Sequence, residues 1–295
     1  MTAEGAETVR PEILRLRVDD LELEALCYGP ADGVPVIALH GWLDNALSFE
    51  AIAQRQQSLR LVALDLPGHG HSDHKPASGS YGIWEDLRSI VGVADQLGWS
   101  RFCLLAHSRG AMMAALLAAA QPQRVAALVC LDGLLTSPFD EADFAKQLGR
   151  YLQDYEKTGR PPKAFASLDE AAAARIRAMP MSMPAARRIV SRATSLGADG
   201  HYRWRSDRRL ALASPIKLSR GQWLAVMRGI QAPLLFVSAR QGFGEQLLAL
   251  LAEGESPPHF RVITVDGDHH CHMGESAAEI ATAAEAHFLA VWQSS

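Results

Sequence analysis

The chain has 295 residues, 48% of them hydrophobic, and a formal net charge of -4. A chain of this length and apolar content can bury one large core without help from disulfides or metals. The charge provides no basic field that would attract nucleic acid, so we expect a small-molecule partner. Because the first residues are polar and no stretch reaches about 18 uninterrupted apolar residues, we expect no membrane span and a cytoplasmic protein.

The first half of the chain predicts strands that alternate with helices. Residues 13–18 and 21–28 show the period-two alternation of an antiparallel hairpin at a sheet edge. Near-continuous apolar runs, typical of strands buried on both faces, then follow at 35–41, 59–68, 101–108 and 124–133. Between them, apolar residues from Ile83 onward recur with helical spacing until Gly98, which predicts a helix that ends there.

The second half contains a change of pattern. From about residue 134 to about 218 the chain becomes rich in Arg and Ala, with helical stretches that prolines interrupt. Strand-like runs return at 233–239 and 260–267, and a final helix follows. We therefore predict an α/β fold with a mostly parallel, doubly wound sheet. Its core is divided into 1–133 and 219–295, and 134–218 forms an inserted helical lid.

A candidate nucleophile lies at the junction of a predicted strand and a predicted helix. The pentapeptide Ala-His-Ser-Arg-Gly at 106–110 directly follows an apolar run and precedes a helical stretch. This placement is typical of a nucleophile elbow, in which a strained turn exposes the serine and the residues two away must be small. Ser108 is the predicted nucleophile, and Ala106 replaces the usual glycine. The alternative is a serine that merely caps the helix.

A late histidine is the candidate general base. His269 is the first histidine after the run 260–267, in the sequence Asp-Gly-Asp-His-His-Cys-His-Met. A base that follows the nucleophile and the last strand fits a serine-histidine-acid triad. His270 and His272 are rival candidates, and the three histidines could instead form a metal site or a polar loop.

The acid that would orient the base has two candidates. Asp132 directly follows the apolar run Leu-Val-Cys-Leu, 24 residues after Ser108. No aspartate follows the run 233–239, where only Glu245 is available, several residues later. We favour Asp132, although an aspartate beside a glycine can also be a simple turn residue.

Acyl transfer develops a negative charge on oxygen, which backbone N–H groups stabilise best. The turn His-Gly-Trp at 40–42 follows a predicted strand, and Arg109 follows the candidate nucleophile. We predict that the amides of Trp42 and Arg109 form an oxyanion hole.

Five longer sequence motifs surround or accompany these candidate triad and oxyanion residues. They are His-Gly-Trp-Leu-Asp-Asn-Ala (40–46), Asp-Leu-Pro-Gly-His-Gly-His-Ser (65–72), His-Ser-Arg-Gly (107–110), the stretch 201–210 with Ser-Pro at 214–215, and Gly-Asp-His-His-Cys-His-Met (267–273). With them the chain resembles the α/β-hydrolase superfamily, and within it the serine hydrolase-like proteins. The resemblance implies the α/β-hydrolase fold and a Ser-His-acid mechanism acting on an ester. Ala106 and Gln241 depart from the family pattern, and Gln241 leaves the acid in doubt.

The sequence is also compatible with other functions. The string His-Gly-His-Ser-Asp-His at 69–74 matches the ligand string of binuclear metallohydrolases. A non-catalytic binding protein could also keep this fold. A perhydrolase or a C–C bond hydrolase would share the same triad. We expect no organic cofactor, since no complete dinucleotide loop or P-loop occurs, and no metal.

Overall fold

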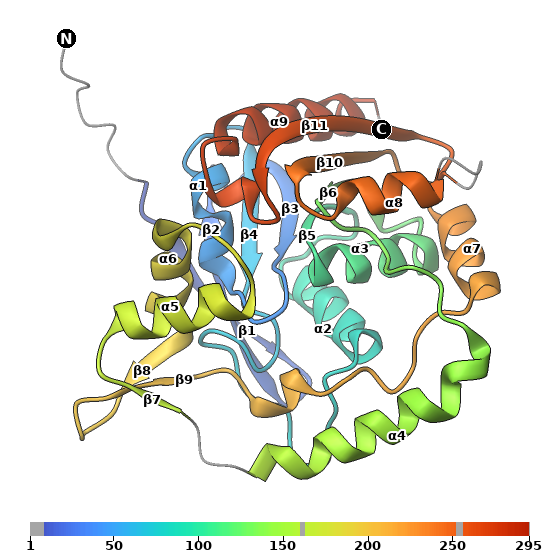
Figure 1. The fold of residues 1–295 in the computed structure, drawn as a ribbon. Coiled ribbons are helices and arrows are strands. Elements are labelled where there is room, and N and C mark those ends of the chain that lie inside the picture. Colours follow the sequence, from blue (N-terminus) through green and yellow to red (C-terminus); the bar gives the residue numbers. More distant parts are fainter. Residues whose placement is uncertain (1–8, 160–162, 252–255, 295) are drawn as a thin grey trace.

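The computed structural model describes residues 9–159, 163–251 and 256–294. Within them a central sheet runs in the order β1-β2-β4-β3-β5-β6-β10-β11 (Figure 1). Its strands are β1 (Glu12–Val18), β2 (Leu21–Tyr28), β3 (Val34–Leu39), β4 (Leu59–Leu64), β5 (Phe102–His107), β6 (Val125–Leu131), β10 (Leu234–Gln241) and β11 (Phe260–Asp268). The β1–β2 and β2–β4 pairs are antiparallel and the others are parallel. The prediction of an edge hairpin followed by a mostly parallel sheet is confirmed.

Helices cover both faces of this sheet (Figure 1). They are α1 (Glu50–Ala53), α2 (Ile83–Gln96), α3 (Arg109–Ala120), α7 (Arg220–Gly229), α8 (Gly244–Leu251) and α9 (Ala277–Trp292). One buried core joins the sheet to α2, α3, α7 and α8, and another joins it to α1 and α9. Successive strand residues enter opposite cores, as Val36 and Ile37 do, because side chains alternate along a strand. This doubly wound arrangement is the predicted one.

The segment between β6 and α7 is only partly helical. It contains α4 (Phe144–Tyr155), α5 (Leu168–Ala178) and α6 (Met183–Ala193). It also contains a small sheet, in the order β7-β9-β8, of β7 (Ala164–Phe165), β9 (Tyr202–Trp204) and β8 (Thr194–Leu196). The sequence did not predict this sheet, because strands of two or three residues are too short to show a period. This segment also contains short 3₁₀ turns at Glu141–Asp143, Glu156–Gly159 and Arg208–Ala211, and two more lie outside it at Ala46–Phe49 and Cys271–Met273.

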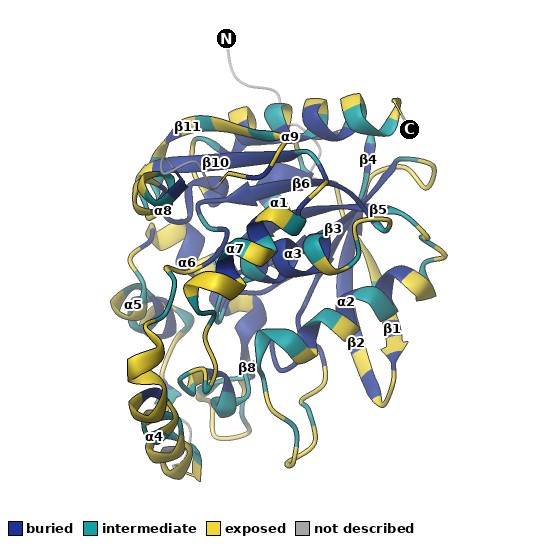
Figure 2. Cartoon of the chain, turned by 90° about the vertical axis from the view of Figure 1, so that its right-hand side faces the viewer, coloured by how far each residue is buried: buried dark blue, intermediate teal, exposed yellow. Residues whose placement is uncertain are grey.

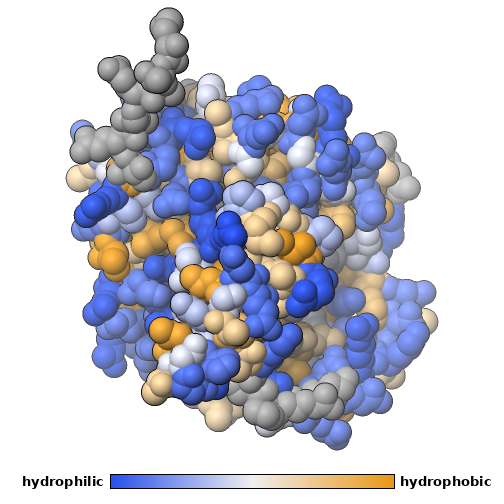
Figure 3. Space-filling view, turned by 60° about the vertical axis from the view of Figure 1, so that its left-hand side comes forward, coloured by the Kyte–Doolittle hydropathy of each residue, from blue (hydrophilic) through white to orange (hydrophobic). Residues whose placement is uncertain are grey.

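Burial differs sharply along this inserted segment. Helices α5 and α6 share a small core that includes Ile189 and, from the loop after β11, Met273. On the face that comes forward in Figure 3, hydrophobic side chains form small separate groups among hydrophilic ones. Helix α4 is largely exposed (Figure 2), and Phe144 and Leu152 are 49% and 59% accessible. Among the described residues, no helix has the length and apolar character to cross a bilayer.

Candidate active site

Ser108 lies in a strained turn between β5 and α3. Its backbone angles are φ 51° and ψ -114°, a region that residues other than glycine rarely adopt. Small neighbours make this turn possible. A Cβ atom at Gly110 would lie 2.1 Å from the carbonyl oxygen of Leu39, and one at Gly133 would lie 2.8 Å from the Cα of Ser108. Ala106 is fully buried within β5, so its methyl group is accommodated. The geometry is that of the predicted elbow.

Three predicted side chains come together at the carboxyl edge of the sheet. Ser108 follows β5, Asp132 follows β6 and His269 follows β11. The Nε2 atom of His269 is 2.8 Å from the Oγ of Ser108, and its Nδ1 atom is 2.7 Å from the Oδ2 of Asp132. Because an ionised carboxylate only accepts hydrogen bonds, Nδ1 carries the proton and Nε2 is left to accept from the serine hydroxyl.

Backbone amides surround the Asp132 carboxylate. Its Oδ1 accepts from the N–H groups of Ala239 and Gly244, both at 3.0 Å, and its Oδ2 accepts from that of Phe243 at 2.8 Å. A Cβ atom at Gly242 would lie 2.1 Å from Oδ2, so only glycine allows this approach. The end of β10 and the residues up to the start of α8 therefore supply backbone amides in the place where the sequence suggested a carboxylate. Glu245, the alternative acid, lies exposed in α8.

The two predicted oxyanion residues border the same edge. Trp42 lies in the turn after β3, where the next residue, Leu43, has a φ of 57°. The indole Nε1 of Trp42 donates to the carbonyl of Leu210 at 2.7 Å. Arg109 is the first residue of α3, and the first amides of a helix have no partner within it. Its guanidinium donates to Asp86 of α2 at 2.8 Å, so the side chain has its own partner and the backbone N–H lies next to Ser108 at the elbow.

Two cavities meet this edge. The larger, of about 400 Å³, is lined by Ser108 and His269 and by the apolar side chains Met112, Leu134, Leu135, Phe243, Leu247 and Leu250. The smaller, of about 140 Å³, is lined by Trp42, Arg109, Arg209 and the α4 residues Tyr151 and Tyr155. Arg109 borders both cavities, so they flank the elbow. Sequence reasoning did not anticipate Phe243, whose ring lies 4.6 Å from that of His269.

The rings of the two rival histidines pack against His107, which in turn packs against the candidate base. His270 Nε2 is 3.3 Å from the Oδ2 of Asp44, and the ring of His272 is 4.3 Å from that of His107. His107 Nε2 donates to the carbonyl of His269 at 2.8 Å, which links the elbow to the histidine loop. Burial lowers the pKa of His107 to about 4 and that of His272 well below its usual value. Asp44 and His107 belong to the motifs at 40–46 and 107–110, but their separation in the sequence did not predict that their side chains meet.

The string at 69–74 is not assembled as a metal site. His71 Nδ1 contacts Glu24 at 3.1 Å, His74 Nε2 donates to the carbonyl of Arg205 at 2.7 Å, and His69 packs against His40. Among the described residues, Asp44, His107 and His270 are the only group of three or more ligand-type side chains whose ligand atoms lie within 4.8 Å of one another. The binuclear metal interpretation of this string therefore has no geometric support.

Comparisons with known proteins agree with this architecture. A family model described as the alpha/beta hydrolase fold matches residues 34–276. Serine hydrolase-like protein 2 of Homo sapiens is 29% identical over 282 residues, which cover 89% of each chain. A serine hydrolase-like protein of Danio rerio is 26% identical over 268 residues, or 87% of this chain and 82% of the other. The crystal structure of hypothetical protein PA1622 of Pseudomonas aeruginosa PAO1 has a TM-score of 0.88 and 38% identity, covering 94% of this chain and 99% of that one. The chain belongs to the α/β-hydrolase family and resembles its serine hydrolase-like proteins.

Proposed function

We propose that this protein is a serine hydrolase that cleaves a small or apolar carboxylic ester through an acyl-enzyme. The observation that carries the proposal is the continuous hydrogen-bonded chain from Ser108 through His269 to Asp132. In this chain Ser108 is the nucleophile, His269 the general base and Asp132 the group that orients the base.

The reaction follows from the geometry in two steps. As the Oγ of Ser108 attacks the ester carbonyl, Nε2 of His269 takes its proton, and the Asp132 carboxylate stabilises the imidazolium. The amides of Trp42 and Arg109 stabilise the tetrahedral oxyanion. The imidazolium then gives its proton to the leaving alcohol. Water, activated by His269, attacks the acyl-enzyme and returns the serine.

The lining of the larger cavity supports an apolar substrate group. Its aliphatic and aromatic walls suit an acyl chain or an apolar alcohol, and Ser108 and His269 lie at the same cavity. The segment 134–218 would act as a lid, because it begins with Leu134 and Leu135 in this cavity and supplies Tyr151 and Tyr155 to the smaller one. One relative, 31% identical over 112 residues, is named Lipase LipV, from Mycobacterium tuberculosis.

The proposal is tested with a fluorophosphonate probe, which labels an activated serine without knowledge of the substrate. We expect rapid labelling of the wild type, none in Ser108→Ala and strongly slowed labelling in His269→Ala. Ser137→Ala is the matched control, because Ser137 lines the same cavity but has no histidine partner among the described hydrogen bonds, and it should label like the wild type. Absence of labelling in folded wild type would favour a non-catalytic binding protein.

A further inference from the structure

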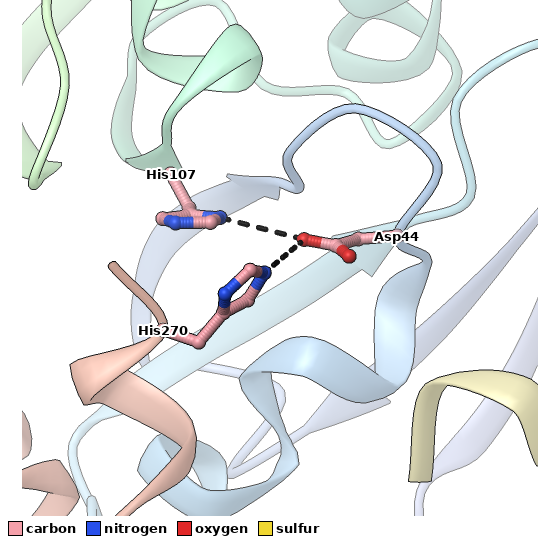
Figure 4. A group of neighbouring side chains, drawn as sticks. All are labelled: Asp44, His107 and His270. Carbon is pink, nitrogen blue, oxygen red and sulfur yellow. Dashed lines mark hydrogen bonds and ion pairs between the residues drawn. The ribbon is translucent and has the colours of Figure 1, made fainter. Parts of the chain in front are cut away.

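A second polar cluster lies next to the candidate triad, since the rings of His107 and His270 are 4.6 and 5.5 Å from that of His269. Asp44, His107 and His270, here called the Asp44 cluster, come from the turn after β3, the end of β5 and the loop after β11. Figure 4 shows their side chains pointing toward one another. All three are buried, with at most 3% of each residue accessible. The mechanism proposed above uses none of these side chains.

The hydrogen bonding of His107 leaves a conflict within this cluster. Its Nε2 lies 2.8 Å from the carbonyl oxygen of His269, so Nε2 must carry the ring proton. In the neutral ring, Nδ1 then has only a lone pair, and it faces the Oδ2 of Asp44 at 3.5 Å. This Nδ1 atom has no hydrogen-bond partner among the described residues. The Oδ2 of Asp44 is also 3.3 Å from Nε2 of His270, its hydrogen-bond partner, so Nδ1 of His107 is the buried acceptor that lacks a donor within the described ranges. A cation bound by both Nδ1 and Oδ2 would give it a partner.

The distances in the cluster fit a particular kind of cation. Two imidazole nitrogens and one carboxylate oxygen are a ligand set that Zn²⁺ binds at about 2.0–2.2 Å. Ligand atoms at adjacent corners of such a tetrahedron lie about 3.4 Å apart. The Oδ2 of Asp44 lies 3.5 Å from Nδ1 of His107 and 3.3 Å from Nε2 of His270. We propose that the Asp44 cluster binds a divalent transition-metal ion such as Zn²⁺.

A nearby glycine keeps a side chain away from these ligand atoms. A Cβ atom at Gly41 would lie 2.8 Å from Nδ1 of His107 and 2.9 Å from Oδ2 of Asp44, the two atoms that face each other. Any larger residue would occupy the space beside them. The ring of His272 also packs on His107, and neither of its nitrogens has a hydrogen-bond partner in the described part of the chain. Gly41 thus adds no side chain beside the ligand atoms, and His272 adds an imidazole ring that makes no competing hydrogen bond to them.

An arginine limits how tightly the ion is held. The guanidinium of Arg175, from α5, donates to Oδ1 of Asp44 at 2.7 Å and leaves Oδ2 for the ion. Its positive charge reduces the attraction of the carboxylate for a second cation. The ion would connect the oxyanion turn, the elbow and the histidine loop without taking Ser108 or His269 as a ligand, so it would stabilise the folded protein.

The test titrates chelator-treated protein with Co²⁺ alone, because tetrahedral Co²⁺ has strong visible absorption bands, and then displaces Co²⁺ with Zn²⁺. We expect one Co²⁺ per chain and a higher Tm with Zn²⁺. His270→Gln removes one ligand and should lose the bands. His71→Gln is the matched control, since His71 lies outside the cluster, and should keep them. Both variants are checked for folding by circular dichroism.

Arg175→Gln separates a metal site from a purely structural cluster. Removal of the guanidinium charge should tighten Co²⁺ binding about tenfold, whereas damage to the fold would weaken it. If His270→Gln does not fold, the near-isosteric Asp44→Asn takes its place. The proposal is overturned if folded wild type binds no Co²⁺, or if the ligand variant binds it as the wild type does. None of these readouts depends on hydrolysis, so the outcome is independent of the proposed function.

Discussion

Backbone strain gathers at the candidate site. Four non-glycine residues in the described ranges have a positive φ, and Leu43, Ser108 and Asp132 are three of them. Such conformations cost of order 1–3 kcal/mol each and persist only where surrounding contacts impose them. Leu43 follows Trp42, a proposed oxyanion residue, Ser108 is the proposed nucleophile, and Asp132 is held by three amides. The strain therefore coincides with the groups that the proposed mechanism uses.

The choice of acid can be tested at a single residue. We expect Asp132→Asn to lower kcat roughly 10⁴-fold, because an amide does not hold the imidazole in the tautomer that accepts the serine proton. Glu245→Gln should leave kcat unchanged, since His269 bonds to Asp132 and Glu245 is exposed. Steady-state hydrolysis of a p-nitrophenyl ester measures both. A large loss in Glu245→Gln would reverse the assignment.

The amides around Asp132 make a glycine essential. In Gly242→Ala the new methyl group would meet Oδ2 of Asp132 and push the loop away, with loss of amide bonds to the carboxylate. A hydrogen bond to a charged group contributes about 1.5–3 kcal/mol, so kcat should fall roughly tenfold to a hundredfold. Gly221→Ala is the matched control, because a Cβ atom there meets nothing within 4 Å. Equal activity of the two variants would show that the loop position is unimportant.

The sequence predicted some residues of the candidate site and did not predict others, and the difference has a physical reason. Ser108 and His269 were predicted because each lies at a strand end, and the structure brings them within hydrogen-bonding distance. Asp132 remained uncertain because its partners are backbone amides, which leave no mark in residue type. The contact of Asp44 with His270 spans 226 residues, and no local spacing reveals so distant a pair.

At the scale of elements, prediction succeeded where burial was uniform. The apolar runs that became β3, β5 and β6 are buried along their full length, so their hydrophobic signal was continuous. The stop at Gly98 after α2 was also correct, and this residue has a φ of 72°. The inserted segment was harder to predict, because its small sheet depends on pairing between β7, β8 and β9 rather than on local pattern.

Helix α6 is joined to the core by a buried charge cluster. The guanidinium of Arg192 donates to Asp65 and Glu24, both at 2.9 Å, and all three side chains are less than 10% accessible. Breaking a buried pair leaves uncompensated carboxylates, so Arg192→Ala should lower the free energy of unfolding by about 3–5 kcal/mol. Arg187→Ala on the same helix breaks an exposed pair with Asp169, which solvent screens, so it should lower the free energy of unfolding far less. Urea denaturation compares the two, and similar losses would contradict the argument.

At the scale of the whole molecule, the inserted segment and the core are connected by charge as well as by apolar packing. Arg175 of α5 contacts Asp44 in the turn after β3, and Arg192 of α6 contacts Asp65 after β4. Asp44 follows β3 and Asp65 follows β4, so both contacts lie at the carboxyl edge of the sheet, where the candidate residues gather. Helix α4, in contrast, exposes Phe144 and Leu152. We therefore expect α5 and α6 to unfold together with the core.

Buried neutral histidines should make the stability of the whole molecule depend on pH. His40 is fully buried, and its Nδ1 donates to the carbonyl of Gly41 while its Nε2 accepts from the N–H of Leu66. Burial lowers the pKa of His40 below its usual value, and it outweighs the opposite effect of the carboxylates of Asp65 and Asp44. The imidazolium could not accept from Leu66, so the folded state disfavours the proton that the unfolded state binds.

The unfolding free energy should therefore fall as the pH drops below about 6.5, the pKa of an unfolded histidine, by up to about 1.4 kcal/mol per pH unit for each such group. His40→Gln keeps an amide donor and acceptor but does not titrate, so its loss of stability between about pH 7.5 and about pH 5.5 should be smaller than that of the wild type. The exposed His259 provides the control, since His259→Gln should leave the wild-type slope unchanged. Denaturant unfolding across this range measures the three slopes. Because burial also lowers the pKa of His69, part of the slope should remain in His40→Gln, whereas an undiminished slope would show that His40 is not among the groups responsible.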